Sequence, residues 1–172
     1  APSVPLKQEP MTLEFFSATD TGRARNNNED SVALDEATAL VVLADGMGGY
    51  NAGEVASSMA TSFIKSELGR WLSEASESAT DTDVRRAMDI CVDNANRAIF
   101  NAANSNPQYA GMGTTLVVAV IRDNRLLLGQ FLNHTARIDR QAVSAIAQAL
   151  DAEIGDGTVA LESPRDPGSE TP

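Results

Sequence analysis

The stretch that decides the fold is RARNNNEDSVALDEATALVVLADGMGGYNAGEVAS, residues 23–57. Its segments SVALD (31–35) and ALVVLAD (39–45) are predicted strands, and the second is apolar on both faces, which favours a central position in a sheet. Two acidic islands flank these strands: Glu29-Asp30 and Asp45-Gly46. The stretch therefore predicts carboxylates held at the ends of buried strands, with glycines following the second.

The other predicted elements surround this pair of strands. Residues 12–20 have the composition of a strand, and apolar residues at three- and four-residue spacing predict amphipathic helices over 52–72 and 84–100, expected to run antiparallel. Residues 114–130 predict a hairpin that turns at Asp123-Asn124. A further helix is expected over 140–154.

Composition limits the class of protein. A chain of 172 residues with 42% hydrophobic residues suggests one folded domain, and its formal charge of -11 argues against binding nucleic acid or anionic membranes. No apolar run approaches the roughly 20 residues that span a bilayer, so no membrane span is expected. The one cysteine cannot form an internal disulfide, and the cytoplasm is the expected location.

The acidic islands have the chemistry of a metal site. Asp45 offers a side-chain oxygen and Gly46 a sterically open carbonyl, which are ligands that Mg²⁺ and Mn²⁺ accept. Asp30 can add another oxygen, whereas Glu29 points to the opposite face wherever Asp30 is in a strand. Arg25 is near enough to pair with phosphate oxygens. Either island alone is more often a solvated turn, but together with the arginine they favour a metal cleft.

Three segments resemble a known family. RARNNNEDSV (23–32), VVLADGMGGYNAGEVAS (41–57) and GMGTTLVVAVI (111–121) look like the N-terminal half of the bacterial PPM (PP2C-like) metal-dependent protein serine/threonine phosphatases. The resemblance covers residues 15–129 and implies an α+β fold, a four-layer α-β-β-α sandwich that is incomplete in this chain. The expected division is a disordered leader, a partial PP2C-like phosphatase domain, a divergent helical segment and a disordered tail: 1–10, 11–130, 131–158 and 159–172.

The same resemblance implies roles for these residues. Two ions, Mn²⁺ or Mg²⁺, would be bridged by Asp45, and the Gly46 carbonyl would bind one of them. Asp30 and Glu29 would belong to the metal shell, partly through water, and Arg25 would receive the substrate phosphate. The implied reaction is hydrolysis of phosphoserine and phosphothreonine in proteins phosphorylated by a serine/threonine kinase. The sequence leaves the oligomeric state open.

The family pattern stops after the hairpin. Where a Gly-Asp-Ser segment is expected the chain reads GQFLNHTARID (129–139), and no suitable Asp-Gly or Asp-Asn follows. Three other Asp-Asn or Asp-Gly pairs are present, but their positions in the predicted structure do not suit a metal ligand: Asp93-Asn94, Asp123-Asn124 and Asp156-Gly157. The chain is therefore expected to be a fragment, frame-shifted or degenerate, and its catalytic activity is in doubt.

Alternatives from other classes remain at this stage. The missing aspartates favour a non-catalytic pseudo-phosphatase or interaction domain, and the strand-glycine-helix order around Asp45 is shared, less closely, with nucleotide and S-adenosylmethionine binders. The spacing from Cys91 to Arg97 matches cysteine-dependent phosphatases, but the segment is predicted to be helical and Cys91 a core residue. His134, the only histidine, is not expected to bind metal.

Overall fold

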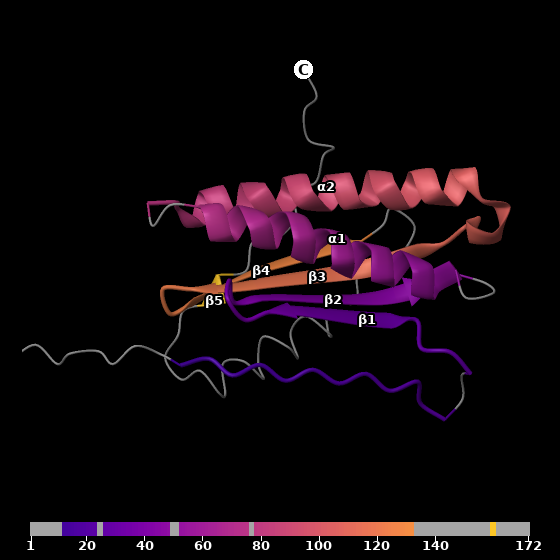
Figure 1. The fold of residues 1–172 in the computed structure, drawn as a ribbon, viewed down its shortest axis with the longest axis horizontal. Coiled ribbons are helices and arrows are strands. Elements are labelled where there is room, and N and C mark those ends of the chain that lie inside the picture. The colour runs from indigo at the N-terminus through magenta and orange to yellow at the C-terminus, as the bar shows by residue number, and fades with distance from the viewer. Residues whose placement is uncertain (1–11, 24–25, 49–51, 76–77, 133–158, 161–172) are drawn as a thin grey trace, which may run out of the picture.

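The fold consists of one sheet with two helices on one of its faces (Figure 1). It is seen in a computed structural model that describes residues 12–23, 26–48, 52–75, 78–132 and 159–160. The strands are β1 (Asp30–Asp35), β2 (Leu40–Met47), β3 (Gly113–Arg122), β4 (Arg125–Leu132) and β5 (Val159–Ala160). The helices are α1 (Ala52–Glu74) and α2 (Asp81–Ser105), followed by the 3₁₀ turn η1 (Pro107–Tyr109).

The sheet order follows the chain, β1-β2-β3-β4-β5. The first four strands are antiparallel to their neighbours, while β5 pairs in parallel with β4. The prediction that residues 39–45 form a central strand is confirmed, because β2 lies between β1 and β3. The predicted hairpin is also confirmed: Asp123 and Asn124 both have positive φ, 51° and 57°, as the two central residues of a tight hairpin turn require.

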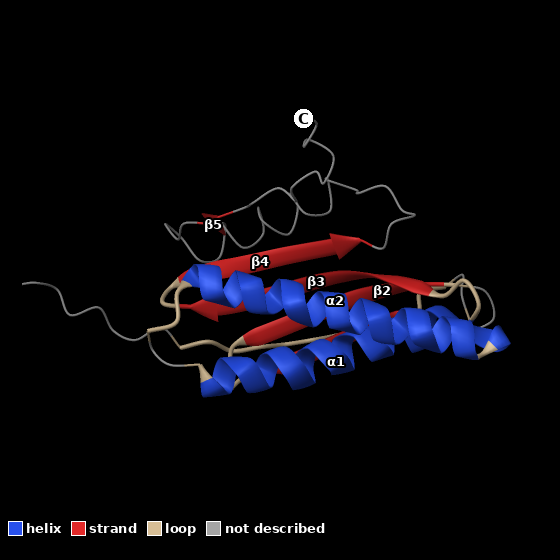
Figure 2. Cartoon of the chain, turned by 90° about the horizontal axis from the view of Figure 1, so that it is seen from above, coloured by secondary structure: helices blue, strands red, loops and turns tan. Residues whose placement is uncertain are grey.

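Both helices cover the same face of the sheet. Helix α1 packs on β1, β2 and β3, and α2 packs on α1 and β4 (Figure 2). The sheet-facing residues of the first half of α1 are all small, which lets the helix approach the strands closely: Ala52, Gly53, Ala56, Ser57, Ala60 and Thr61. Larger residues, Ile64 and Leu68, fill the core nearer the end of the helix. Helix α1 is also joined to β1 by a 2.8 Å hydrogen bond between the Ser31 and Thr61 hydroxyls.

The two faces of β2 differ in burial. Leu40, Val42 and Ala44 point toward the helices and are 0% exposed, whereas Leu43 on the other face is 39% exposed. Asp45 belongs to the same alternating set as Leu43 and therefore lies on the face away from the helices. The acidic site is thus built on the face of the sheet that α1 and α2 leave uncovered.

Three features of the structure differ from the sequence predictions. The predicted strand over 12–20 is wrong, because these residues are described without strand structure and pair with no described strand; composition cannot supply the partner a strand needs. Strand β4 continues to Leu132, two residues past the expected domain boundary, and β5 lies at the start of the predicted tail.

The leader and the 140–154 helix lie outside the described residues. Within the described residues, no helix is long and apolar enough to cross a membrane.

Candidate metal centre

The centre of the site is a pair of aspartates on neighbouring strands. Asp30 and Asp45 are direct partners in the β1–β2 register, and both are exposed. The Gly46 N–H donates to the Glu29 carbonyl oxygen at 3.0 Å, so the adjacent Asp30–Asp45 pair occupies a non-hydrogen-bonded position, where side chains are closer together. The fold therefore brings the two acidic islands together at these two residues.

Two threonines hold the backbone of Asp45. The β2–β3 pairing joins residues 40–43 and 46–47 of β2 to β3 but skips Ala44 and Asp45. In place of ladder bonds, the Asp45 N–H donates to Thr115 Oγ1 at 3.2 Å and the Thr114 hydroxyl donates to the Asp45 carbonyl oxygen at 3.0 Å. Both threonines lie in the segment GMGTT, and the sequence alone predicted no role for them. Their hydroxyls fix the peptide that carries the central carboxylate.

Glu29 takes a different direction from Asp30. Its carboxylate lies against Gly53 in the first turn of α1, close enough that a Cβ built on Gly53 would be 3.0 Å from Glu29 Cδ and Oε2. The N-terminus of a helix carries partial positive charge, which favours an anion at this position. The predicted divergence of the two acidic side chains is confirmed, with Glu29 facing the helix and Asp30 facing Asp45.

Gly46 is buried where three backbone segments meet. A Cβ built on it would overlap the Gly53 carbonyl oxygen and lie 2.6 Å from the Glu29 carbonyl oxygen. No side chain therefore fits at this position. The sequence predicted a sterically open backbone at Gly46, and the structure shows that the position of its missing side chain is closely packed.

The structure brings together only part of the expected site. Arg25 and Asp156 lie outside the described residues, Asp93 is exposed on α2, and Asp123 is in the β3–β4 turn. In the part of the chain that the structure describes, no group of three or more His, Cys, Asp or Glu side chains could hold a metal ion. The oxygen donors of Asp30 and Asp45 fit a hard divalent cation by type.

Two alternatives from the sequence are excluded by the fold. Cys91 is buried in α2, where burial raises the pKa of its thiol, and Arg97 lies exposed on the same helix, so no phosphate-binding loop joins them. A dinucleotide fold needs parallel strands around its glycine-rich turn, whereas β2 is antiparallel to both neighbours. His134 lies outside the described residues.

An antiparallel sheet with a carboxylate pair on one face and helices on the other is the pattern expected of the PP2C-like phosphatases. The family model for protein phosphatase 2C matches residues 21–131. The chain belongs to this family, which confirms the resemblance drawn from the three sequence segments.

Curated relatives are bacterial serine/threonine phosphatases. The chain is 34% identical over 121 residues to the serine/threonine phosphatase stp of Listeria innocua, an alignment that covers 69% of this chain and 46% of the relative. It is 35% identical over 116 residues to the serine/threonine protein phosphatase PstP of Mycobacterium tuberculosis, which covers 67% of this chain and 21% of that protein. The chain thus spans less than half the length of each of these relatives.

Solved structures give the same family. The Mycobacterium tuberculosis phosphatase PstP/Ppp aligns with a TM-score of 0.50 at 29% identity, covering 76% of this chain and 56% of that one. The catalytic domain of PstP in complex with two manganese ions aligns with a TM-score of 0.51 at 29% identity, covering 76% and 57%. The expected α+β fold is confirmed, and the described residues supply one sheet of it with the helices of one face.

Proposed function

We propose that this chain carries one side of the metal centre of a phosphatase that removes phosphate from phosphoserine and phosphothreonine in proteins. The observation that carries the proposal is the cross-strand pair of Asp30 and Asp45. Like charges directly opposite one another destabilise a sheet, so such a pair is best explained by a cation that both contact. Membership of the protein phosphatase 2C family and the two manganese ions of the PstP complex support the same role.

Each residue of the site has a part in this proposal. Asp30 and Asp45 would hold Mn²⁺ or Mg²⁺ through carboxylate oxygens, with the Gly46 carbonyl as a further ligand. Glu29, whose carboxylate faces α1, would take part only through water. Bound divalent ions supply an acidified water as nucleophile and neutralise charge on the phosphoryl oxygens.

The residues around the carboxylates orient the reaction. The Thr114 and Thr115 hydroxyls keep the Asp45 peptide in place, which preserves the geometry that in-line attack requires. The Arg25 guanidinium would bind the substrate phosphate through paired hydrogen bonds. Met47, directly after Asp45-Gly46, has no proton to donate, so the leaving oxygen would take its proton from another group.

The proposal includes the setting of the reaction. The substrates would be phosphorylated proteins, which a serine/threonine kinase must supply, and the reaction would take place in the cytoplasm. The single cysteine requires no oxidising compartment, since no internal disulfide can form.

Hydrolysis of p-nitrophenyl phosphate and of a phosphothreonine peptide, with and without Mn²⁺, tests the proposal. Asp45→Asn should lower metal-dependent turnover by about 100-fold or more, because it removes a direct ligand. Asp93→Asn is the matched control, since it makes the same charge change on an exposed position of α2. Absence of Mn²⁺-dependent turnover in the unsubstituted chain would contradict its catalytic role.

The non-catalytic alternative makes a different prediction in the same experiment. A pseudo-phosphatase would bind Mn²⁺ at Asp45 without turnover. Binding that Asp45→Asn abolishes, together with no hydrolysis by the unsubstituted chain, would identify this second function.

A further inference from the structure

We propose that Gly53 is a positioning residue for this metal centre, because its missing side chain lets the first turn of α1 seat Gly46 and Glu29 beside Asp45. The inference rests on the function proposed above and assigns a role to a residue that contributes no ligand atom. It follows from the packing of three segments that are distant in sequence: the residue before β1, the end of β2 and the start of α1.

Gly46 and Gly53 pack so closely that neither position leaves room for a side chain. A Cβ on Gly46 would overlap the Gly53 carbonyl oxygen and lie 2.5 Å from the Gly53 carbonyl carbon. A Cβ on Gly53 would lie 2.9 Å from the Met47 nitrogen and 3.0 Å from Glu29 Oε2. Three of these four neighbouring atoms belong to the backbone and cannot move without shifting the strand or the helix. Both glycines are therefore required where α1 crosses the end of β2.

The shape of α1 supports this close approach. Ala52, Ala56 and Ala60 repeat at four-residue spacing and are each no more than 1% exposed, so the first half of the helix rests on the sheet through small residues. Gly53 is the smallest of the sheet-facing set and is the one that faces β2 at the metal end. Glu29 adds an anion to the same helix terminus, where the helix dipole favours it.

The consequence for the site is positional. Gly46 directly follows Asp45 in β2, and its N–H is bonded to the Glu29 carbonyl oxygen, so a helix pushed away by a new methyl group would shift this peptide link. The Gly46 carbonyl is a proposed ligand and Asp45 is its direct neighbour. Gly53 thereby acts on metal binding through Gly46 and Glu29 and makes no contact with metal itself.

Helix α1 contains a matched control for the test. A Cβ on Gly69, near the other end of α1, would lie 3.0 Å from Asp35 Oδ2 and 3.8 Å from Leu40 Cδ2. These are side-chain atoms that can rotate away, and Gly69 lies at the end of the sheet opposite Asp45. Gly53→Ala and Gly69→Ala thus make the same chemical change in the same helix, and only the first presses on the backbone of β2.

The experiment measures Mn²⁺ affinity by electron paramagnetic resonance of free Mn²⁺, and hydrogen exchange of the Gly46 and Met47 amides without metal. We expect Gly53→Ala to weaken Mn²⁺ binding roughly 10- to 100-fold, the range for residues that orient metal ligands, and to speed exchange at Gly46. Gly69→Ala should match the unsubstituted chain in both. Circular dichroism of each variant establishes that it folds.

Unchanged Mn²⁺ affinity in a folded Gly53→Ala variant would overturn the inference. If the unsubstituted chain binds no Mn²⁺, the proposed function fails and this inference fails with it, whereas Mn²⁺ binding by the unsubstituted chain with equal amide exchange at Gly46 in Gly53→Ala overturns the inference alone. If Gly53→Ala does not fold, the same change is made in a Glu29→Ala background, which removes the carboxylate contact and keeps the contact with the Met47 nitrogen. Affinity below that of Glu29→Ala alone upholds the inference, and equal affinity overturns it.

Discussion

At the scale of single residues, the Asp45 carboxylate depends on neighbours that are not themselves acidic. The ladder between β2 and β3 is interrupted at Ala44 and Asp45, and threonine hydroxyls take the place of backbone partners. A side-chain hydroxyl is a weaker constraint than a paired strand, because its own rotamer must also be held. The position of Asp45 should therefore be sensitive to the chemistry of Thr115.

Thr115→Val tests this dependence with almost no change of shape. Valine removes the acceptor of the Asp45 N–H, which should cost about 0.5–1.5 kcal/mol of stability and weaken Mn²⁺ binding about 10-fold. Thr115→Ser is the control, because it keeps the hydroxyl and loses only a methyl group. Isothermal titration with Mn²⁺ and thermal melting provide the two measurements. Equal Mn²⁺ affinity for the valine and serine variants would show that the hydroxyl does not hold the site.

The candidate metal ligands could be predicted from the sequence, whereas the residues that position them could not. Asp30, Asp45 and Gly46 were recognisable because each follows or precedes a strand whose apolar pattern is clear. Gly53 and Thr115 were not, because their roles depend on contacts between segments that are far apart in the chain. A glycine in a helix or a threonine in a strand has no local signature that separates a positioning role from ordinary packing.

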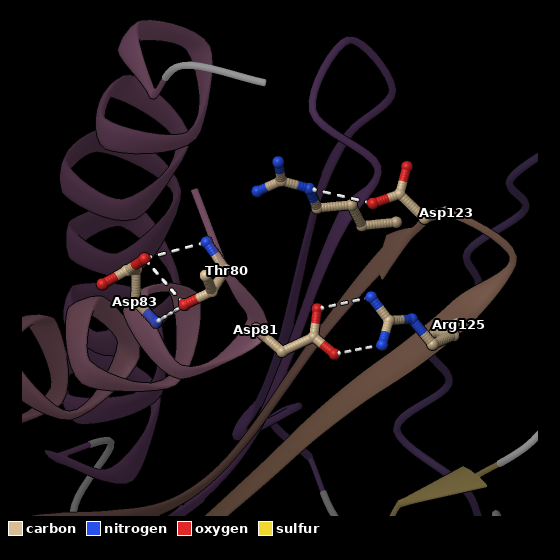
Figure 3. A network of polar contacts seen from close by, with 6 residues as sticks. Thr80, Asp81, Asp83, Asp123 and Arg125 are labelled. Carbon is tan, nitrogen blue, oxygen red and sulfur yellow. Dashed lines mark hydrogen bonds and ion pairs between the residues drawn. The ribbon is translucent and has the colours of Figure 1, made fainter. Parts of the chain in front are cut away.

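At the scale of elements, the start of α2 is fixed by a reciprocal cap. The Thr80 hydroxyl accepts from the Asp83 N–H at 3.2 Å, and Asp83 Oδ2 accepts from the Thr80 N–H at 2.8 Å (Figure 3). Next to it, Asp81 forms a 2.7 Å ion pair with Arg125 at the start of β4. The cap defines where α2 begins, and the ion pair joins that end of the helix to the sheet.

The cap predicts a pH dependence of stability. Hydrogen bonds from the Thr80 backbone and hydroxyl lower the pKa of the Asp83 carboxyl in the folded chain. A lowered folded pKa means that the stabilisation is present above the unfolded pKa and is lost as pH falls through the folded value. Thermal melting should show Asp83→Asn below the unsubstituted chain at pH 7, with the difference narrowing below about pH 4. Thr82→Ala, in the same exposed turn, is the control, and a pH-independent difference for Asp83→Asn would contradict the role of the cap.

The two faces of β2 should differ in their contribution to stability. Leu40 is 0% exposed beneath α1, whereas Leu43 is 39% exposed on the opposite face. Leu40→Ala should cost about 2–5 kcal/mol, the range for a buried leucine that leaves a cavity, and Leu43→Ala less than about 1 kcal/mol. Urea unfolding measures both. Similar losses for the two variants would mean that the face opposite the helices is as well packed as the core.

Most elements were predictable because their patterns are local. The apolar run of β2, the three- and four-residue spacing of α1 and α2, and the Asp123-Asn124 turn are each visible within one element. The strand predicted over 12–20 failed for the opposite reason, since a β-rich composition forms a strand only when another strand pairs with it. The parallel pairing of β5 with β4 likewise joins segments that are distant in the chain, which composition does not encode.

At the scale of the whole molecule, the acidic site belongs to a strongly negative chain. The formal net charge is -11, and two of the negative charges, those of Asp30 and Asp45, lie opposite each other on one face of the sheet. Without a divalent cation this arrangement opposes folding by a few tenths of a kcal/mol. A cation bound only by the folded chain reverses the balance, because ligand binding stabilises the state that binds it.

Asp45→Asn should therefore change stability in opposite directions with and without metal. In chelator, the variant should melt at or slightly above the temperature of the unsubstituted chain, because one of two facing charges is removed. With Mn²⁺ at about 100 times its dissociation constant, the unsubstituted chain should gain about 2.7 kcal/mol and the variant almost nothing. Asp93→Asn, which also removes one charge but lies on α2, should retain the full gain. The same Mn²⁺-dependent gain in stability in all three proteins would place the Mn²⁺ site elsewhere. A gain that is lost only in Asp45→Asn would show that the facing carboxylates lower the stability of the metal-free chain and serve metal binding.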